Sequence, residues 1–255
     1  MKFGSLFSGI GGFDLAFERA GMECAWQCEI DPKAQEVLKR HWSVPIIEDV
    51  RNVTRDTVES VDLICGGFPC QDVSLAGERL GLDGKRSTLW SEFSRIICEF
   101  KPRWVVVENV RGLLSANNGQ FFGNILRDLS RSGYDAEWKI IRASDFGAPH
   151  QRERIWIVAY PNGTIGFDGI LQTGRNTSEE QRKACFWGAD WRKFTVESRP
   201  AAILQRFTET TLGQSPLVRM DDGIPAIVDR LHQLGNAVVP QVAEWIGRRI
   251  VEVSK

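Results

Sequence analysis

The sequence predicts an α/β protein built on a doubly wound, mostly parallel β-sheet. Short apolar segments rich in β-branched residues alternate with amphipathic segments of about 10 to 15 residues through residues 1–160. Glycine- and proline-containing turns separate the two kinds of segment. Strands and helices that alternate in this way form parallel sheets, because each helix returns the chain to the edge where the previous strand began.

The expected elements follow one another in a regular order. A strand at 2–7 leads to a helix that ends at Gly21, a residue type suited to a helix C-terminus. A strand at 23–30 leads to a helix at 31–42, with Asp31 as the expected N-cap and Pro32 as the first helical residue. Further strands are expected at 61–67, 103–110, 134–141 and 154–160, and further helices at 87–100 (capped by Ser87), 119–133 and 239–253.

The end of the chain defines the expected domain organisation. Residues 161–234 are rich in glycine, threonine and asparagine and show little periodicity, which predicts a separate small domain. The last helix is expected to pack back on the sheet through one apolar face, formed by Val242, Ile246, Ile250 and Val253. The prediction is a sheet domain formed by residues 1–160 and 235–255, and a small domain formed by residues 161–234.

Composition excludes several classes of protein. The chain has 255 residues, of which 42% are hydrophobic and 25% charged, as in ordinary globular proteins. No apolar run is long enough to cross a bilayer, and the glycines of "MKFGSLFSGIGG" favour a first strand over a signal peptide. The 6 cysteines are too few for a disulfide scaffold, so free thiols in a reducing cytoplasm are expected. Cys24 and Cys28 form a CxxxC pair, but no second pair completes a zinc site, and no metal is expected.

A glycine-rich turn follows the first expected strand in "LFSGIGGFDLAF". Gly9, Gly11 and Gly12 allow the backbone to approach a ligand closely. The turn lacks the Gly-Lys-Ser/Thr of a P-loop, and Asp14 stands where the dinucleotide-binding fingerprint has its third glycine. The pattern therefore indicates a ligand without a demanding pyrophosphate site.

Carboxylates follow this turn at the positions where a nucleoside would need them. Glu29 and Asp31 come about 20 residues later, at the end of the second strand, where a carboxylate suits a ribose diol. Asp49 ends the segment "VPIIED" and is able to accept a hydrogen bond from an adenine amino group. Together they favour an adenosine-containing ligand; a tight turn with a solvated acidic helix start is the alternative, and the pattern alone weighs the two evenly.

Cys70 lies in "DLICGGFPCQDVSLAG", just past the carboxyl end of an expected strand. Open α/β sheets bind their ligands at this edge, and a nearby helix N-terminus or cation there would lower the pKa of a thiol and favour the thiolate. Cys65 and Cys98 lie within apolar periodicity and are expected to be buried. Cys70 has polar neighbours instead and is the candidate nucleophile, with a purely structural cysteine as the alternative.

Two further motifs place polar groups beside expected strands. In "RWVVVENVRG", Glu108 and Asn109 emerge where the strand ends, and a desolvated carboxyl group there is able to hold or donate a proton. A helix cap is the alternative for Asn109. In "GAPHQRERIWIV", Arg152 and Arg154 alternate into a strand and are expected to point the same way. Two such guanidinium groups suit a carboxylate, a phosphate or a base carbonyl, with a charged strand edge as the alternative.

The order and spacing of these motifs are more specific than any one of them. The series "FSGIGGF", "CEID", "EDV", "GGFPCQD", "VVENVRG", "QRERIWIV" and "LGNAVVPQVAEWIG" resembles the DNA (cytosine-5)-methyltransferase family. The resemblance covers nearly all of residues 3–160 and then residues 234–250. It implies a class I methyltransferase fold, Rossmann-like and dependent on S-adenosylmethionine, with a small target-recognition domain.

The resemblance also implies roles for individual residues. Glu29 would bind the ribose hydroxyls, Ile30 and Phe7 would pack on the adenine, and Asp49 would contact its amino group. The implied catalytic residues are the nucleophile Cys70 together with Glu108, Arg152 and Arg154, which would contact the target base. The implied cofactor-binding residues are Phe7, Gly9, Gly11, Glu29, Ile30, Asp49, Pro69 and Asn236.

The reaction implied is methylation of C5 of cytosine in double-stranded DNA at a specific short sequence. The Cys70 thiolate would add to C6 and move electron density onto C5, while Glu108 stabilises the intermediate through N3 and an arginine holds the base oxygen. The base is expected to be flipped, because none of this is possible inside a stacked duplex. The alternatives are a methyltransferase that acts on tRNA and a non-catalytic DNA-binding phage or regulatory protein that kept the fold.

The expected partner is double-stranded DNA, bound by a monomer in the cytoplasm of a bacterium or phage-infected cell. The formal net charge is −1, so a polyanion has to be held by a local basic patch. Recognition is expected within residues 163–229, which are short for the family's recognition region and leave the target sequence open. Candidates for DNA backbone contacts there are Arg175, Arg182, Lys183, Arg192 and Lys193, whereas Trp187 and Trp191 are expected to pack in a small core.

Overall fold

The computed structural model describes residues 1–69, 89–148, 151–164, 170–171 and 237–255. The chain divides into two compact units, one formed by Met1–Gln172 with Ala237–Lys255 and one formed by Thr173–Asn236. The second unit lies outside the described residues, as do Ser87 and all the candidate DNA-contact residues between 175 and 193. The role of residues 161–234 as a recognition domain therefore stays a prediction. Within the described ranges, no helix has the length and apolar character needed to cross a membrane.

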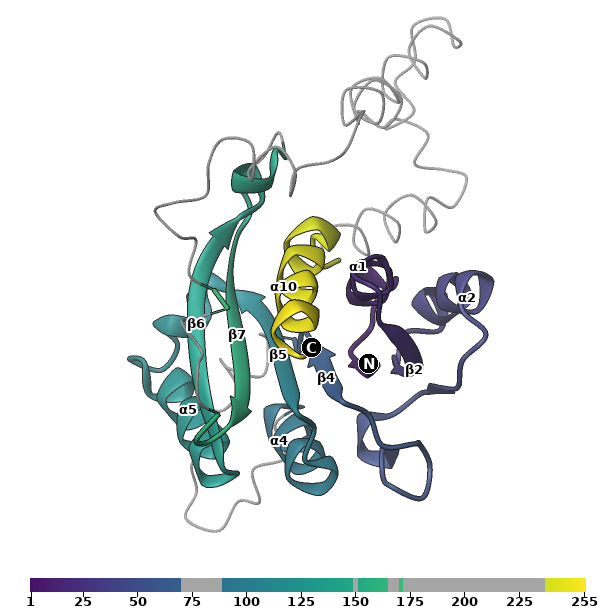
Figure 1. Cartoon of the computed structure of the whole chain (residues 1–255), viewed down its shortest axis with the longest axis horizontal. Helices are drawn as coiled ribbons and strands as arrows, with labels where there is room; N and C mark the ends of the chain where they lie inside the picture. Colours follow the sequence, from purple (N-terminus) through teal and green to yellow (C-terminus); the bar gives the residue numbers. More distant parts are fainter. Residues whose placement is uncertain (70–88, 149–150, 165–169, 172–236) are drawn as a thin grey trace, which may run out of the picture. The chain divides into compact units, whose positions relative to one another are not determined.

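The first unit is built on a seven-stranded sheet with the order β3-β2-β1-β4-β5-β7-β6 (Figure 1). Its strands are β1 (Lys2–Leu6), β2 (Glu23–Cys28), β3 (Ile46–Ile47), β4 (Leu63–Gly66), β5 (Trp104–Val110), β6 (Tyr134–Arg142) and β7 (Glu153–Pro161). β7 is antiparallel to its neighbours β5 and β6, and the other pairs are parallel. The strand order reverses between β1 and β4, which is the place where open α/β sheets form a ligand crevice.

Helices cover both faces of the sheet. The helices are α1 (Gly12–Arg19), α2 (Pro32–His41), α4 (Leu89–Phe100), α5 (Gln120–Arg131) and α10 (Pro240–Val253), with short 3-10 turns η1 (Val50–Asn52), η2 (Arg111–Leu114) and η3 (Ala143–Phe146). α1 and α10 lie side by side on one face (Figure 1). Along β5, Val105 and Val107 pack in the core with α4 and α5, whereas Trp104 and Val106 pack in the core with α1 and α10. This arrangement confirms the predicted doubly wound class.

The predicted helix ends are confirmed where the structure describes them. Asp31 is the N-cap of α2 and accepts a hydrogen bond from the backbone N–H of Lys33 at 2.9 Å, with Pro32 in the first turn. α1 ends just before Gly21, whose φ of 88° is a left-handed value that glycine adopts readily. The last helix, predicted at 239–253, runs from Pro240 to Val253 and so begins one residue later than predicted.

Two predictions of burial are wrong. Val242, Ile246 and Ile250 are buried in the sheet-facing stripe of α10, but Val253 is 45% exposed because the helix ends there, in its last turn. Cys98 is exposed because the buried stripe of α4 runs through Phe93, Ile96, Ile97 and Phe100 and leaves position 98 on the outer side. Its Sγ lies 3.0 Å from Ser132 Oγ. Cys65 is fully buried, as predicted.

A buried polar cluster joins β1, α1 and β2. Asp14 has no exposed surface, and its carboxylate accepts hydrogen bonds from Gln27 Nε2 at 2.8 Å and from Ser5 Oγ at 3.2 Å. Cys24 Sγ lies 3.5 Å from Asp14 Oδ1 and donates the third bond. Burial raises the pKa of Asp14 to about 6 in spite of these bonds, because desolvation penalises the charged form. The residue in place of the third glycine is therefore an internal anchor of the first turn of α1.

This raised pKa predicts how stability depends on pH. The folded state holds the Asp14 proton more tightly than the unfolded chain does. The free energy of unfolding should therefore fall by about 3 kcal/mol as the pH rises from about 4 to about 6.5, and Asp14 should have no such effect below that range. Asp14→Asn removes this titration. Urea unfolding measures the free energy of unfolding of both proteins from pH 4 to 7.5. Over this range, the value for the variant should rise relative to that of the wild type by about this amount. Asp135→Asn, at an exposed position of β6, is the control; a difference that stays constant with pH contradicts the account.

Candidate functional site

The predicted site residues gather at one edge of the sheet. Phe7 follows β1, Glu29 follows β2, and Glu108 lies near the end of β5. These strands belong to the parallel part of the sheet, so their carboxyl ends meet at the same edge. Arg154 pairs with Val110 at the start of β7, which reaches this edge because it runs in the opposite direction. Residues far apart in the sequence are thus brought together.

The glycine-rich turn is tied to the end of β2 by Glu29. The backbone N–H of Gly9 donates to Glu29 Oε2 at 2.7 Å, and the N–H of Asp31 donates to Glu29 Oε1 at 2.9 Å. Gly9 and Gly11 have φ values of 56° and 86°. A Cβ on Gly9 would meet no atom within 4 Å, so the described residues leave open space on that side of the turn. The geometry allows a ligand to approach the turn beside a carboxylate.

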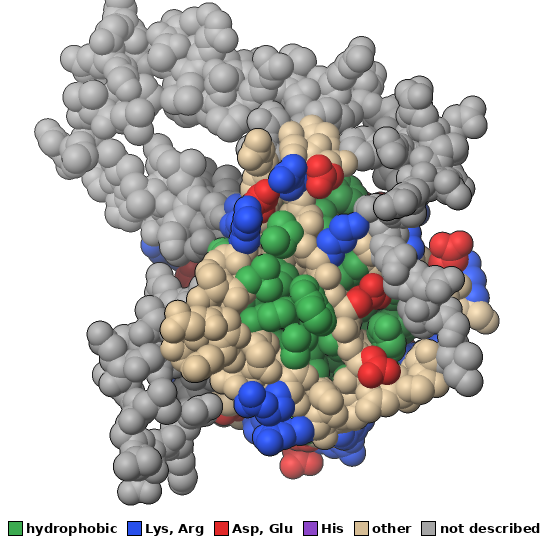
Figure 2. Space-filling view, turned by 90° about the vertical axis from the view of Figure 1, so that its left-hand side faces the viewer, with side chains coloured by type: hydrophobic (Ala, Val, Ile, Leu, Met, Phe, Trp, Pro, Cys, Tyr) green, Lys and Arg blue, Asp and Glu red, His purple; other side chains and the backbone are tan. Residues whose placement is uncertain are grey.

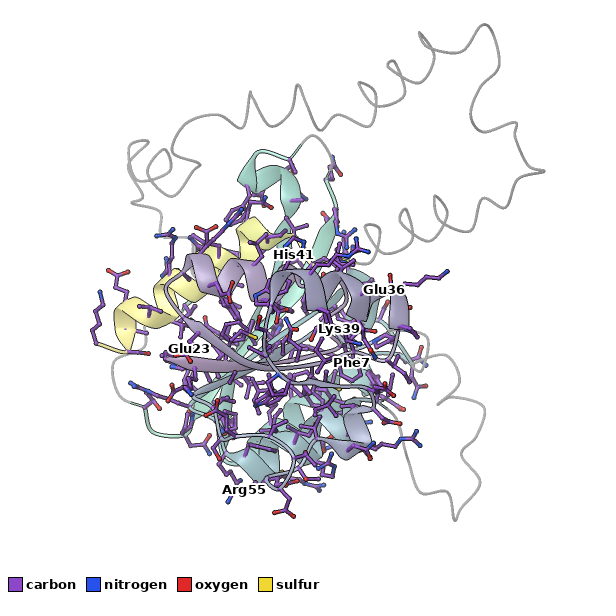
Figure 3. All side chains as sticks on the ribbon, turned by 90° about the vertical axis from the view of Figure 1, so that its right-hand side faces the viewer. Phe7, Glu23, Glu36, Lys39, His41 and Arg55 are labelled. Atoms are coloured by element: carbon purple, nitrogen blue, oxygen red, sulfur yellow. The ribbon has the colours of Figure 1, made fainter. Side chains whose placement is uncertain are left out.

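Apolar side chains flank this open side. Ile30 directly follows Glu29 and is 71% exposed, which is unusual for a large aliphatic residue. Phe7, labelled in Figure 3, is half-buried. It stacks on Phe93, with ring centroids 6.3 Å apart. An exposed aliphatic side chain, an aromatic ring and a carboxylate at one strand edge are suited to a nucleoside, whose base is apolar and whose ribose donates hydrogen bonds. The residues present therefore fit the adenosine part of S-adenosylmethionine.

Asp49 is engaged by its own turn. Its side chain caps η1, accepting from the backbone N–H of Arg51 at 2.9 Å, and forms an ion pair with the Arg51 guanidinium. Hydrogen bonds from the Arg51 side chain and backbone lower the pKa of Asp49 to about 2. An adenine amino group would have to share this carboxylate with Arg51, and the role predicted for Asp49 stays a prediction.

Glu108 is the most perturbed acid of the candidate site. It is 7% exposed, and its Oε1 lies 3.1 Å from Arg154 Nε. The contact lacks hydrogen-bond geometry, so this buried oxygen has no hydrogen-bond partner among the described residues. Burial raises the pKa of Glu108 to about 7, against the opposing charges of Arg154 and Arg152. Desolvation thus outweighs two guanidinium groups, and the carboxyl group is able to hold a proton near neutral pH.

Arg152 differs from the expectation in its surroundings. β7 begins at Glu153, so Arg152 lies just before the strand, with a φ of 24°, and does not alternate within it as predicted. Its Nη2 donates to the carbonyl oxygen of Ala237 at 2.7 Å. Its charge still acts on Glu108, so both arginines lie near the carboxyl group. Arg152 connects this group to the segment that leads into α10.

The loop toward Cys70 is fastened from β5. Asn109 is 3% exposed; its Nδ2 donates to the carbonyl oxygen of Phe68 at 2.9 Å, and its Oδ1 accepts from the backbone N–H of Val110 at 2.8 Å. Gly67 permits a close approach, since a Cβ there would lie 3.2 Å from Glu108 Oε2. Pro69 is exposed at the end of this described stretch. Cys70 itself, like Asn236, lies outside the described residues.

Sequence reasoning missed two features of this site. Asn109 is predicted as a polar group at the strand end or a helix cap, and its bond to Phe68 gives it a further function as the anchor of the loop. Val238 was not singled out, although its carbonyl oxygen would lie 2.8 Å from a Cβ on Gly12 and its Cγ2 4.0 Å from one on Gly67. The paired glycines of "CGGFP" were the available signal, because adjacent glycines after a strand indicate that other groups approach the backbone closely.

Comparisons with known proteins identify the family. The family model described as C-5 cytosine-specific DNA methylase matches residues 1–202.

The chain belongs to the C-5 cytosine-specific DNA methylase family.

Two relatives show how far the likeness of this methylase-family chain extends. It is 36% identical over 162 residues to the type II methyltransferase M.HhaI of Haemophilus parahaemolyticus, a match that covers 64% of this chain and 50% of that protein. It is 38% identical over 170 residues to the type II methyltransferase M.NgoFVII of Neisseria gonorrhoeae, covering 66% of this chain and 45% of that protein. The methylase-family chain thus spans about half the length of these relatives.

Solved structures support the fold of the methylase family. A DNA modification methyltransferase encoded within an E. coli prophage matches over 100% of both chains with a TM-score of 0.62 and 18% identity. The Entamoeba histolytica methyltransferase EhMeth matches over 100% of this chain and 99% of its own, with a TM-score of 0.64 and 15% identity. At such identities the likeness shows the fold, a Rossmann-like methyltransferase sheet.

Metal ligands do not gather in the described part of this methylase. No three His, Cys, Asp or Glu side chains within it come close enough to hold an ion. Cys24 and Cys28 are both buried, and burial raises the pKa of the Cys28 thiol to about 12. Cys28 behaves as a small apolar residue of the core, whereas Cys24 donates to Asp14.

The anchor formed by Asn109 is open to a direct test. Asn109→Ala should lower the free energy of unfolding by about 1–3 kcal/mol, because the Phe68 carbonyl and the Val110 N–H lose their partner in a buried place. Asn124→Ala, which removes a partner of Arg127 on the surface of α5, should change it by less than about 0.5 kcal/mol. Urea unfolding measures both variants. Equal effects would show that the loop does not depend on Asn109.

Proposed function

We propose that this methylase-family chain transfers a methyl group from S-adenosylmethionine to C5 of cytosine in double-stranded DNA, at a specific short sequence and on a flipped base. Membership of the family supports the class of reaction. The observation that carries the proposal is Glu108, a buried carboxyl group with a pKa of about 7, one oxygen of which has no hydrogen-bond partner among the described residues. It lies beside Arg154 and against the glycine turn that leads to Cys70.

Cytosine needs this set of groups because its C5 is a weak nucleophile. In the proposed mechanism the Cys70 thiolate forms a bond to C6, and the electron pair of the C5–C6 double bond moves toward C5 and N3. A proton shared between Glu108 and N3 stabilises that charge, while a guanidinium group of Arg154 or Arg152 holds the base oxygen. After C5 has gained the methyl group, a base removes the C5 proton, and expulsion of the thiolate restores the ring.

S-adenosylmethionine supplies the electrophilic methyl group when bound. Phe7, Gly9, Gly11, Glu29 and Ile30 would hold its adenosine part. Each Glu29 oxygen accepts one backbone N–H and has a further lone pair for a ribose hydroxyl. Pro69, Asp49 and Asn236 complete the proposed set.

The partner and the arrangement of domains are part of the same proposal. Residues 161–234 would recognise the target sequence of double-stranded DNA, and residues 1–160 and 235–255 would carry out the chemistry. A monomer acting on DNA in the cytoplasm suits this division, because one chain would supply every proposed catalytic group. The type II methyltransferases among the relatives support a setting in which DNA is modified at short sites.

The covalent step predicts a trapped complex. Duplex DNA that carries 5-fluorocytosine should form a stable adduct with the protein in the presence of S-adenosylmethionine, because fluorine cannot leave C5 as a proton does and the thiolate is not expelled. A pool of random duplexes serves as substrate, since the target sequence is open. Denaturing gel electrophoresis and mass spectrometry should place the adduct on Cys70, and Cys70→Ser should form none.

Three outcomes of the trapping experiment decide between the alternatives. An adduct with fluorinated tRNA and none with duplex DNA would favour the tRNA enzyme. Absence of any adduct, together with sequence-specific DNA binding and no methyl transfer, would favour the non-catalytic DNA-binding protein. Methyl transfer to DNA by Cys70→Ser at the wild-type rate would exclude the covalent mechanism.

The raised pKa of Glu108 predicts a pH effect on the rate. Above pH 7 the free protein loses the Glu108 proton, so the single-turnover rate at subsaturating DNA should carry an inflection near pH 7 with a fall on its alkaline side. Glu108→Gln should lower the rate by about 10²–10⁴-fold and remove the inflection. Glu252→Gln, at an exposed position of α10, should leave both unchanged. Persistence of the inflection in Glu108→Gln would assign it to another group.

A further inference from the structure

A second set of charged side chains lies at the same edge of the sheet. Arg111 Nη1 lies 2.7 Å from Glu153 Oε2, and Arg142 Nε lies 2.8 Å from Glu153 Oε1. We call these three residues the guanidinium clamp. Hydrogen bonds from Arg142 and Arg111 lower the pKa of Glu153, so the carboxylate is ionised at neutral pH. One carboxylate faces two guanidinium groups, which leaves the clamp with a net charge of one positive unit.

The topology of the sheet brings the clamp together. Arg111 directly follows β5, Arg142 ends β6, and Glu153 begins β7, which lies between those two strands. The central carboxylate therefore holds one guanidinium group from each side. Arg154, which faces Glu108, is the next residue along β7, and successive side chains of a strand leave it on opposite faces. The clamp thus lies at the same edge of the sheet as the site but on the opposite face of β7. There it is suited to contacts with a nucleic-acid backbone and not with the base itself.

The clamp is exposed and has hydrogen-bond donors to spare. The side chains of Arg111 and Arg142 are 64% and 54% exposed, whereas that of Glu153 is 20% exposed. Within the described residues, each guanidinium group gives only one N–H to Glu153, out of the five that an arginine carries. Exposed ion pairs contribute only about 0–1 kcal/mol to stability, so stability alone gives little reason for the arrangement. A guanidinium group held in one orientation is suited to a phosphate, which it binds through two parallel bonds.

Positive charge predominates around the ends of β5 and β6 and the start of β7. Four arginines lie there, and the carboxyl groups near them are Glu108, Glu153 and Asp145, the last of which accepts from the backbone N–H of Arg142 at 3.3 Å. Figure 2 shows basic and acidic side chains gathered at the upper end of the described surface, above a hydrophobic area. A chain with a net charge of −1 has to bind a polyanion through a local concentration of this kind.

We propose that the guanidinium clamp binds a phosphodiester of the DNA backbone that flanks the target base. This inference rests on the proposed function and adds to it a contact that does not depend on sequence. Such a contact would fix the position of the duplex at this edge of the sheet while the target base is flipped out of the stack. The carboxylate of Glu153 fixes the two guanidinium groups before the phosphate arrives, so little side-chain entropy is lost on binding.

Salt dependence of binding tests the clamp. For R111Q/R142Q, the slope of log affinity against log NaCl concentration, measured with a mixed-sequence DNA duplex, should become shallower by about 0.9, because one phosphate contact is lost. The matched control is R103Q/R131Q, because both residues are exposed and lie at the opposite edge, before β5 and at the end of α5. The control should keep the wild-type slope. An equal slope for both double variants overturns the proposal.

A charge-preserving variant and an RNA arm complete the test. R111K/R142K should restore most of the slope, and the thermal unfolding of all three variants should match that of the wild type, which separates lost charge from damaged folding. A slope change with tRNA but none with duplex DNA overturns the assignment to DNA. If the wild type forms the 5-fluorocytosine adduct while the slopes stay equal, only the clamp fails. If it forms no adduct and transfers no methyl group, the proposed function fails, whatever the slopes.

Discussion

The direction of β7 is the constraint on which the site depends. A parallel strand between β5 and β6 would begin at the amino edge of the sheet and carry its first residues away from the crevice. Because β7 is antiparallel to both neighbours, its start lies beside the end of β5. This reversal places Arg154 against Glu108 and Glu153 between Arg111 and Arg142. One change of strand direction therefore brings Arg154 and Glu153 to the edge where β5 and β6 end beside Arg111 and Arg142.

The environment of Glu108 shows which electrostatic effect wins. Two nearby guanidinium groups favour the charged carboxylate, and burial disfavours it; the pKa of about 7 shows that desolvation is the larger effect. Glu153 has the opposite balance, since its two arginines lower its pKa in a more solvated place. Neighbouring strands thus carry one carboxyl group that holds a proton near neutrality and one that does not. Chemistry on a base requires the first, and a fixed cationic surface requires the second.

Much of the fold could be predicted from the sequence, because it depends on local signals. Apolar periodicity and turn residues located the principal strands and helices, and Asp31 and Gly21 marked helix ends correctly. The site could be predicted only as a set of motifs at strand ends. Strand direction and pairing depend on contacts distant in sequence, so the clamp had no local signal, and the paired glycines of "CGGFP" did not reveal that Asn109 binds Phe68. Val253 and Cys98 show the same limit, since periodicity does not reveal where packing stops.

The segment that leads into α10 links the two halves of the crevice. Ala237 accepts a hydrogen bond from Arg152 beside Glu108, and Val238 packs against Gly12 of the cofactor-side turn and Gly67 of the loop toward Cys70. A side chain at Gly12 would push this segment outward, because its Cβ would lie 2.8 Å from the carbonyl oxygen of Val238. Methyl transfer requires the donor and the base to lie within van der Waals contact. The turn that contains Gly12 and the loop that contains Gly67 must therefore keep a fixed distance, which a segment in contact with both is able to maintain. Val238 is suited to this part, because it lies beside both Gly12 and Gly67.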